Sequence, residues 1–190
     1  MNRVAIVLAA GAARRFGGDK LAAPFQGEPL VHHAIRAARA APVNRVIVVA
    51  KPGLDVGEWH GEPTVRRVEL ASDALSDSLK TGIANAQGAE SAFIFLGDMP
   101  LIPHGLAARL ANAIGDAFAA LPRQNGQPGH PVLLSARAFP DIARLTGDEG
   151  AGKLLRARKD IACLDMADQH ILLDIDRPQD LSELQKFAPD

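Results

Sequence analysis

The chain of 190 residues has very little cysteine, almost no net charge and no long apolar run. Its one cysteine, Cys163, cannot form an internal disulfide, so a reducing compartment, the cytoplasm, is expected. The net charge of −1 argues against a protein that grips nucleic acid or an anionic membrane surface. The apolar run near the N-terminus is too short to span a bilayer. Apolar residues make up 47% of the chain, which excludes intrinsic disorder.

The sequence also lacks the spacings that mark covalent or zinc-dependent catalysis. None of the six histidines shares a spacing with serine, cysteine or acidic residues that would define a catalytic triad or a zinc site. Most of these histidines are expected at the surface. Cys163 lies in an apolar, strand-like segment and is expected in the core rather than as a nucleophile.

Short apolar runs alternate with helical patterns along most of the chain. Strands are predicted over residues 4–8, 45–50, 65–70, 92–96, 117–121, 132–134 and 171–176, and helices over residues 30–41, 78–86, 105–114, around Leu154 and Leu155, and after Pro178. This alternation predicts an α/β fold with three αβα layers and a mostly parallel central sheet. No linker or repeat stands out, so residues 1–190 are expected to form one domain.

The segment after the first predicted strand is the most informative. Residues 8–20 read Leu-Ala-Ala-Gly-Ala-Ala-Arg-Arg-Phe-Gly-Gly-Asp-Lys. Its glycines let backbone N–H groups approach an anion, and Arg15 and Lys20 would neutralise that anion. The segment fits neither a Walker A loop nor the dinucleotide fingerprint G-x-G-x-x-G. Its place at the carboxyl end of a parallel strand predicts a phosphate site, and an ordinary basic surface loop is the alternative.

Three aspartates are candidate metal ligands. Asp98 directly follows the predicted strand 92–96 and is expected at the same sheet edge as the glycine-rich loop. Asp98 could hold an Mg²⁺ ion that bridges its carboxylate to a phosphate. Alternatively, Asp98 could be a turn aspartate that caps the next helix. Asp174 and Asp176 end the last predicted strand, two residues apart and therefore on one face. One could complete the metal site while the other caps the helix after Pro178, or both could be structural.

These residues suit the transfer of a nucleotidyl group from a nucleoside triphosphate to a phosphate monoester. The acceptor phosphate has a second pKa of about 6, so it can attack the α-phosphorus without a general base. Catalysis then reduces to alignment and charge neutralisation. Arg15, Lys20 and an Mg²⁺ held by Asp98 would supply both, with pyrophosphate leaving in an in-line displacement.

Four motifs resemble those of the nucleotidyltransferases that activate the molybdenum cofactor, above all the molybdopterin cytidylyltransferase-like branch. They are residues 8–20, Gly97-Asp98-Met99-Pro100, Gly129-His130-Pro131-Val132 and Gly147-Asp148-Glu149-Gly150-Ala151. The resemblance covers nearly the whole chain. It implies a Rossmann-like fold of the GT-A type, CTP and a molybdopterin-type cofactor as substrates, and dependence on Mg²⁺.

The resemblance also implies roles for residues that bind the nucleotide. Leu8, Ala9, Ala10 and Gly11 would line the base and ribose. Arg15 and Lys20 would hold the triphosphate, and Asp98 the metal. Guanylyl-transferring relatives typically have glycine where this chain has Ala10, which favours CTP over GTP. Relatives often carry a polar residue where positions 12 and 13 are alanine here, which removes one hydroxyl contact to phosphate.

Two further segments are assigned in the same way. Residues 78–82 resemble a family segment that closes over the nucleotide, which brings Ser78 near the base and adds Gly82 to the site. The run Gly129-His130-Pro131 is expected to contact the acceptor, although turn packing would equally explain His130.

Two alternatives to cytidylyl transfer to the molybdenum cofactor remain. The enzyme could use GTP, or act on another phosphate-monoester acceptor such as a sugar or polyol phosphate. The chain could instead be a non-catalytic chaperone that delivers the cofactor to a molybdenum hydroxylase, which is also a candidate partner of the enzyme.

Overall fold

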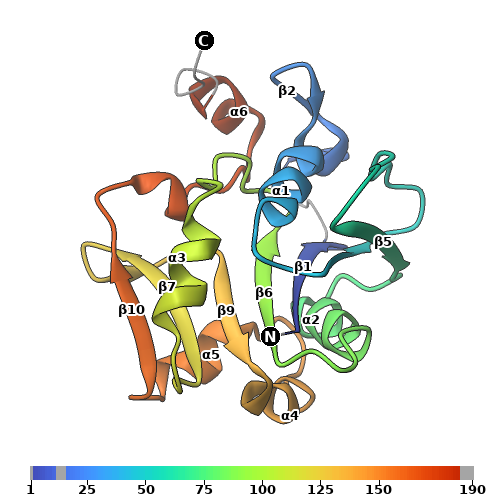
Figure 1. Ribbon diagram of the computed structural model, residues 1–190. Coiled ribbons are helices and arrows are strands. Elements are labelled where there is room, and N and C mark those ends of the chain that lie inside the picture. Colours follow the sequence, from blue (N-terminus) through green and yellow to red (C-terminus); the bar gives the residue numbers. More distant parts are fainter. Residues whose placement is uncertain (1, 12–15, 185–190) are drawn as a thin grey trace.

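A computed structural model describes residues 2–11 and 16–184 of the chain (Figure 1). Arg15, one of the predicted phosphate ligands, lies outside the described residues. The strands are β1 (Arg3–Ala9), β2 (Pro24–Phe25), β3 (Glu28–Pro29), β4 (Arg45–Ala50), β5 (Thr64–Glu69), β6 (Ser91–Leu96), β7 (Ala119–Gln124), β8 (Gln127–Pro128), β9 (Val132–Ser135) and β10 (Ile161–Asp165). The α-helices are α1 (Leu30–Arg39), α2 (Leu75–Ala84), α3 (Leu106–Ala113), α4 (Phe139–Ile142), α5 (Ala151–Arg156) and α6 (Pro178–Leu184).

The central sheet is mixed and mostly parallel, as the sequence predicts. Its strand order is β10-β7-β9-β6-β1-β4-β5, and β8 pairs with β7. β1 is parallel to both β4 and β6, β4 is parallel to β5, and β10 is parallel to β7. β9 runs antiparallel to β6 and β7 and so joins the two parallel blocks. The carboxyl ends of β1 and β6 therefore meet at one edge of the sheet.

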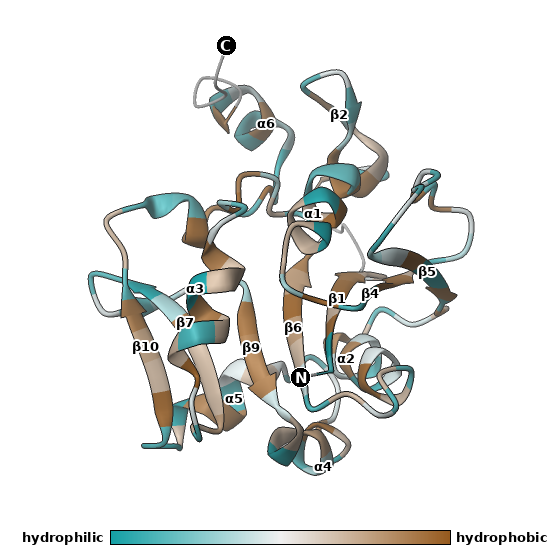
Figure 2. Ribbon diagram, in the orientation of Figure 1, coloured by the Kyte–Doolittle hydropathy of each residue, from teal (hydrophilic) through white to brown (hydrophobic). Residues whose placement is uncertain are grey.

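The strands of the central sheet are mostly hydrophobic (Figure 2), and their alternating side chains are buried on both faces of the sheet. One core contains Val7, Val48 and Phe95 together with α1 and α3. The other contains Ile6 and Ile94 together with residues of α2, α4 and α5. Because strand side chains alternate between faces, these near-continuous apolar strands require helices on both sides. The structure confirms the three-layer α/β fold.

Two segments differ from the prediction. Residues 171–176 do not form a strand: Gln169–Leu172 is a 3₁₀ turn that Asp168 caps by accepting a hydrogen bond from the backbone N–H of His170, and extended chain follows. The apolar run of this segment instead buries Ile171 and Ile175. Cys163 is exposed rather than in the core, because β10 is an edge strand.

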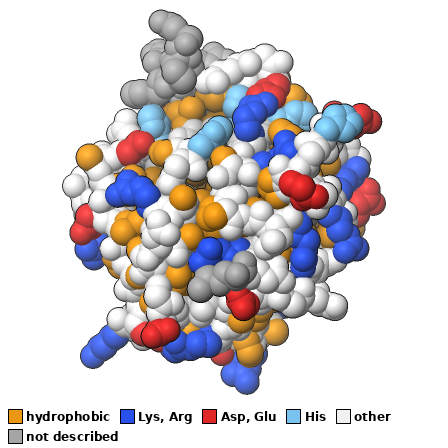
Figure 3. Space-filling view, viewed as in Figure 1, with side chains coloured by type: hydrophobic (Ala, Val, Ile, Leu, Met, Phe, Trp, Pro, Cys, Tyr) orange, Lys and Arg blue, Asp and Glu red, His pale blue; other side chains and the backbone are white. Residues whose placement is uncertain are grey.

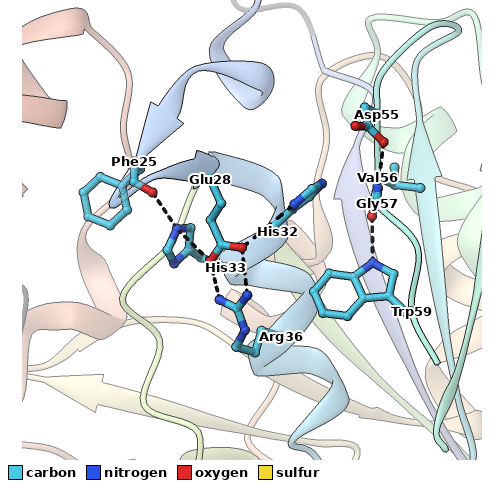
Figure 4. A network of polar contacts seen from close by, with 9 residues as sticks. All are labelled: Phe25, Glu28, His32, His33, Arg36, Asp55, Val56, Gly57 and Trp59. Carbon is cyan, nitrogen blue, oxygen red and sulfur yellow. Dashed lines mark hydrogen bonds and ion pairs between the residues drawn. The ribbon is translucent and has the colours of Figure 1, made fainter. Parts of the chain in front are cut away.

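The short β2–β3 hairpin is held on α1 by a polar network (Figure 4). Most histidines are predicted to lie at the surface, but His33 is buried and donates from Nε2 to the carbonyl oxygen of Phe25 at 2.9 Å. Glu28 accepts a hydrogen bond from Nη2 of Arg36 at 2.8 Å, and this contact lowers the pKa of Glu28. The network fixes the hairpin that directly follows the 3₁₀ turn Lys20–Ala22.

On the face shown in Figure 3, acidic and basic side chains are interspersed around apolar ones. Among the described residues, no helix is long and apolar enough to cross a membrane.

Candidate active site

The site begins where β1 and β6 end side by side. The backbone N–H of Gly97 donates to the carbonyl oxygen of Leu8 at 2.9 Å. A Cβ atom on Gly97 would lie only 3.0 Å from the same oxygen, closer than real Cβ atoms usually come. The missing side chain thus lets the segment before Asp98 approach the end of β1, where the glycine-rich loop starts.

Lys20 and Asp98 meet at this edge, as the sequence predicts. The Nζ atom of Lys20 donates to Oδ2 of Asp98 at 2.7 Å. It also lies 3.4 Å from Oδ1 of Asp176. The Lys20 side chain is only 11% exposed, so this ammonium group is largely removed from water between two carboxylates.

The segment 173–176 brings the other two aspartates to Asp98. The backbone N–H of Ile175 donates to the backbone oxygen of Asp98 at 3.0 Å. The carboxylate of Asp180 accepts hydrogen bonds from the backbone N–H groups of Asp176 and Arg177, so Asp180 caps the start of α6. The predicted capping role therefore belongs to Asp180 rather than to Asp174 or Asp176.

Asp98, Asp174 and Asp176 form an acidic cluster whose ligand oxygens lie within 4.8 Å of one another. Burial raises the pKa of the Asp174 carboxyl, and repulsion by Asp98 and Asp176 adds to the increase. The three carboxylates repel one another even with Lys20 nearby, which favours a further cation. Carboxylate oxygens are also the ligands that Mg²⁺ prefers, so the residues present fit this metal.

The chain that leaves β1 forms one wall of the site. Ala9 and Ala10 are buried, Leu8 is half-buried and Gly11 is exposed.

Sequence reasoning did not identify Lys51, which follows β4 and pairs with Asp19 at 2.9 Å. Its position after the strand next to β1 was the available signal. The pair ties the residue before Lys20 to the sheet.

A cleft of about 980 Å³ lies between α2 and α5. Leu8, Ile94 and Leu96 from the sheet contribute to its apolar lining, and Leu75 and Leu79 line it from α2. Leu96 lies two residues before Asp98, so this end of the cleft is close to the acidic cluster. An apolar lining of this size suits the face of a heterocyclic ring.

Two of the predicted acceptor residues, Gly129 and His130, line the cleft, and Pro131 is buried beside them. The backbone N–H of His130 donates to the carbonyl oxygen of Ile171 at 2.9 Å. A Cβ atom on Gly129 would lie 2.5 Å from this oxygen, so only glycine fits there. Burial lowers the pKa of His130, which keeps its imidazole neutral at pH 7. Turn packing accounts for Gly129, whereas contact of the His130 ring with the acceptor stays a prediction.

The two predicted residues of α2 lie in different surroundings. Ser78 is buried, and its hydroxyl has no hydrogen-bond partner among the described residues. A buried hydroxyl without a partner is uncommon and marks a place for a ligand or water. A Cβ atom on Gly82 would lie 2.5 Å from Cγ2 of Ile6, so close packing of α2 on β1 explains this glycine. Contact of either residue with the nucleotide stays a prediction.

Sequence reasoning also missed the basic side chains of the cleft. Arg123 pairs with Asp165 at 2.8 Å. Within the described part of the chain, the side chain of Arg156 forms no ion pair or hydrogen bond, and its Nη1 atom lies 3.6 Å from where a Cβ of Gly152 would be. A single arginine on a short helix carries no motif, so no signal in the sequence singled it out.

A basic residue and a carboxylate cluster at the carboxyl edge of a mostly parallel sheet define an α/β protein that handles nucleotide phosphates. Residues 5–162 match the MobA-like NTP transferase domain, and the chain belongs to this family of nucleotidyltransferases. The resemblance seen in the motifs is thereby confirmed.

The chain is similar to proteins of several bacteria. It is 29% identical to the purine catabolism protein PucB of Bacillus subtilis (strain 168), over 96% of both chains. It is 25% identical to the molybdenum cofactor cytidylyltransferase of Escherichia coli (strain K12), over 92% of this chain and 91% of the other. A crystal structure of an Rv0371c homolog from Mycobacterium sp. strain JC1 superimposes with a TM-score of 0.83, at 28% identity over 97% of this chain and 96% of that one.

Proposed function

We propose that this nucleotidyltransferase moves CMP from CTP to a molybdopterin-type molybdenum cofactor and releases pyrophosphate, with Mg²⁺ as cofactor. The observation that carries the proposal is the meeting of Lys20 and Asp98 at 2.7 Å within the acidic cluster, beside the start of the glycine-rich loop. The similarity to the cytidylyltransferase of Escherichia coli supports the choice of substrates.

Asp98, Asp174 and Asp176 would hold the Mg²⁺ ion, which when bound supplies charge neutralisation at the triphosphate. Lys20 would bind the triphosphate from the side of the glycine-rich loop, together with Arg15, and Gly11 would leave room for the backbone to approach. The remaining chemistry is alignment, because a phosphate monoester is ionised at neutral pH and attacks without a general base.

The base and the acceptor would share the cleft between α2 and α5. Leu8, Ala9 and Ala10 would contact the base and ribose, with the Ser78 hydroxyl as a hydrogen-bonding group near the base. Ala10 is buried, so its methyl group leaves less room than glycine would, which supports cytosine over guanine. His130, neutral and lining the cleft, would contact the acceptor ring system.

Product analysis by mass tests the proposal. The full chain is incubated with Mg²⁺, molybdopterin-type cofactor and each of the four nucleoside triphosphates, and pyrophosphate is measured in parallel. We expect a cytidylylated cofactor and stoichiometric pyrophosphate with CTP. A guanylylated product would overturn the choice of nucleotide, and transfer only to a sugar or polyol phosphate would overturn the acceptor.

A cofactor chaperone for a molybdenum hydroxylase would give another pattern: cofactor binding without Mg²⁺-dependent pyrophosphate release. That result would overturn the proposed activity.

A further inference from the structure

Lys20 pairs with two of the three carboxylates that a metal ion in the acidic cluster would use. Its Nζ atom lies 2.7 Å from Oδ2 of Asp98 and 3.4 Å from Oδ1 of Asp176. Both aspartates belong to the group whose ligand oxygens lie within 4.8 Å of one another. An ammonium group and a divalent cation therefore compete for the negative charge of Asp98 and Asp176.

The backbone around Lys20 is fixed, whereas its side chain can move. The N–H of Lys20 donates to the carbonyl oxygen of Gly18 at 3.0 Å, and the Lys20 carbonyl accepts from the N–H of Ala23 at 3.1 Å. Asp19 is tied to Lys51. The four-carbon stem of a lysine has several rotamers and carries a compact charge with three donors. Nζ can thus leave the aspartates for an anion beside them without any backbone movement.

We propose that Lys20 is an exchangeable counter-ion. It neutralises Asp98 and Asp176 while neither substrate nor metal is present, and it moves to the triphosphate when metal and nucleotide bind. The triphosphate half of this inference rests on the proposed function. Two consequences follow: the metal alone binds weakly because it must displace Lys20, and metal and nucleotide each strengthen the binding of the other, since thermodynamic coupling is reciprocal.

Binding of Mn²⁺ to the full chain, followed by electron paramagnetic resonance of the free ion, tests the exchange without any turnover. In the wild-type protein, we expect a non-hydrolysable CTP analogue to tighten Mn²⁺ binding about tenfold, within the usual range of coupling between sites. Lys20→Met removes the competing ammonium and leaves the carboxylates, so Mn²⁺ alone should bind about tenfold more tightly than to the wild type. The analogue should then strengthen Mn²⁺ binding less than it does in the wild type, because only the direct contact between metal and triphosphate remains.

Lys51→Met is the matched control, because it removes an equal charge that pairs with Asp19 outside the cluster. It should change Mn²⁺ affinity much less than Lys20→Met does. Asp98→Asn should abolish the tight Mn²⁺ binding in the Lys20→Met background, which places the ion in the cluster. Lys20→Gln, which keeps a polar end group, serves as a second variant if Lys20→Met does not fold.

Equal Mn²⁺ affinity of the wild type and both Lys20 variants without nucleotide would overturn the exchange, even if the enzyme transfers CMP as proposed. Tighter Mn²⁺ binding by the variants would support it even if the acceptor proves to be another phosphate monoester. The two proposals therefore fail separately.

Discussion

The two halves of the sheet differ in how firmly they hold their functional groups. Residues 3–113 contain β1, β4 and β6, whose central side chains are fully buried. Asp98 lies two residues after β6 and pairs with Lys20 of the 3₁₀ turn Lys20–Ala22. Residues 119–184 contain an exposed edge strand, the four-residue α4 and the six-residue α5, in which only Leu155 is buried. We therefore expect substitutions in the mostly exposed α5, which lines the cleft, to cost less stability than substitutions in β1, β4 and β6.

The largest expected effect lies in the first half. Asp98→Asn keeps the shape of the side chain but removes the charge that would hold a metal, so turnover should fall by about a thousandfold or more. Pyrophosphate release measures this, with circular dichroism to verify the fold. Asp116→Asn, an exposed aspartate before β7, is the control and should retain full activity. Wild-type turnover by Asp98→Asn would show that Asp98 does not hold a metal.

Gly129, between β8 and β9, should be the next most sensitive position. A Cβ on Gly129 would lie 2.5 Å from the carbonyl oxygen of Ile171, which belongs to the backbone and cannot easily move. Gly129→Ala should therefore destabilise the protein by about 1–3 kcal/mol, as overpacking commonly does. Urea denaturation measures the free energy of unfolding. Gly105→Ala, where a Cβ meets nothing within 4 Å, should stay within about 0.5 kcal/mol of the wild type.

In the second half, one side chain should affect the acceptor alone. Arg156 lines the cleft and has no partner within the described residues, so its guanidinium is available to an anionic group of the acceptor. Arg156→Ala should raise the KM for the acceptor about tenfold, the usual order for one charged hydrogen bond, and leave the KM for the nucleotide unchanged. Arg109→Ala, an exposed arginine on α3 across the sheet, is the matched control. An equal rise in the KM for the nucleotide would mean that Arg156 does not act on the acceptor alone.

The first half of the fold could be predicted from the sequence more fully than the second. The strands β1, β4 and β6 are continuous apolar runs, as a sheet buried on both faces requires, and the end of β6 indicates where Asp98 lies. The run 171–176 is equally apolar in part, yet it is not a strand. Its apolar residues pack into the core from a 3₁₀ turn, and long-range contacts decide this, such as that between Ile175 and the backbone of Asp98. The sequence singles out Asp174 and Asp176 as candidate metal ligands because it predicts a strand that ends at them, and this strand is not formed.

Arg156 and Lys51 were missed for a related reason. Neither residue belongs to a motif. Lys51 is relevant because it pairs with Asp19, which is distant in the chain, and Arg156 is relevant because its side chain has no partner among the described residues. Cys163 is the opposite case, a residue whose predicted core position is wrong. Its apolar neighbours predict a core position, but a residue of an edge strand has no sheet neighbour on one side, and strand order cannot be read from local composition.

The smallest expected effect concerns the hairpin that follows Lys20. Burial lowers the pKa of His33 in the folded protein below the ordinary 6.5, so between these two values the unfolded chain binds more protons than the folded one. Stability contributed by neutral His33 is complete above about pH 6.5 and declines as the pH falls below it, with a slope of at most about 1.4 kcal/mol per pH unit. Glu28 stays ionised in this window, because Arg36 lowers its pKa.

Urea denaturation at several pH values between 5 and 7 measures this contribution as a difference between wild type and His33→Gln. The wild type should lose stability toward pH 5 more steeply than the variant, while His104→Gln, an exposed histidine, should follow the wild type. Parallel curves for wild type and His33→Gln would mean that the hairpin is held by Glu28 and Arg36 alone. In that case the rigid placement of Lys20 would depend on an ion pair at the surface, and the contrast between the two halves of the molecule would be weaker than the buried histidine suggests.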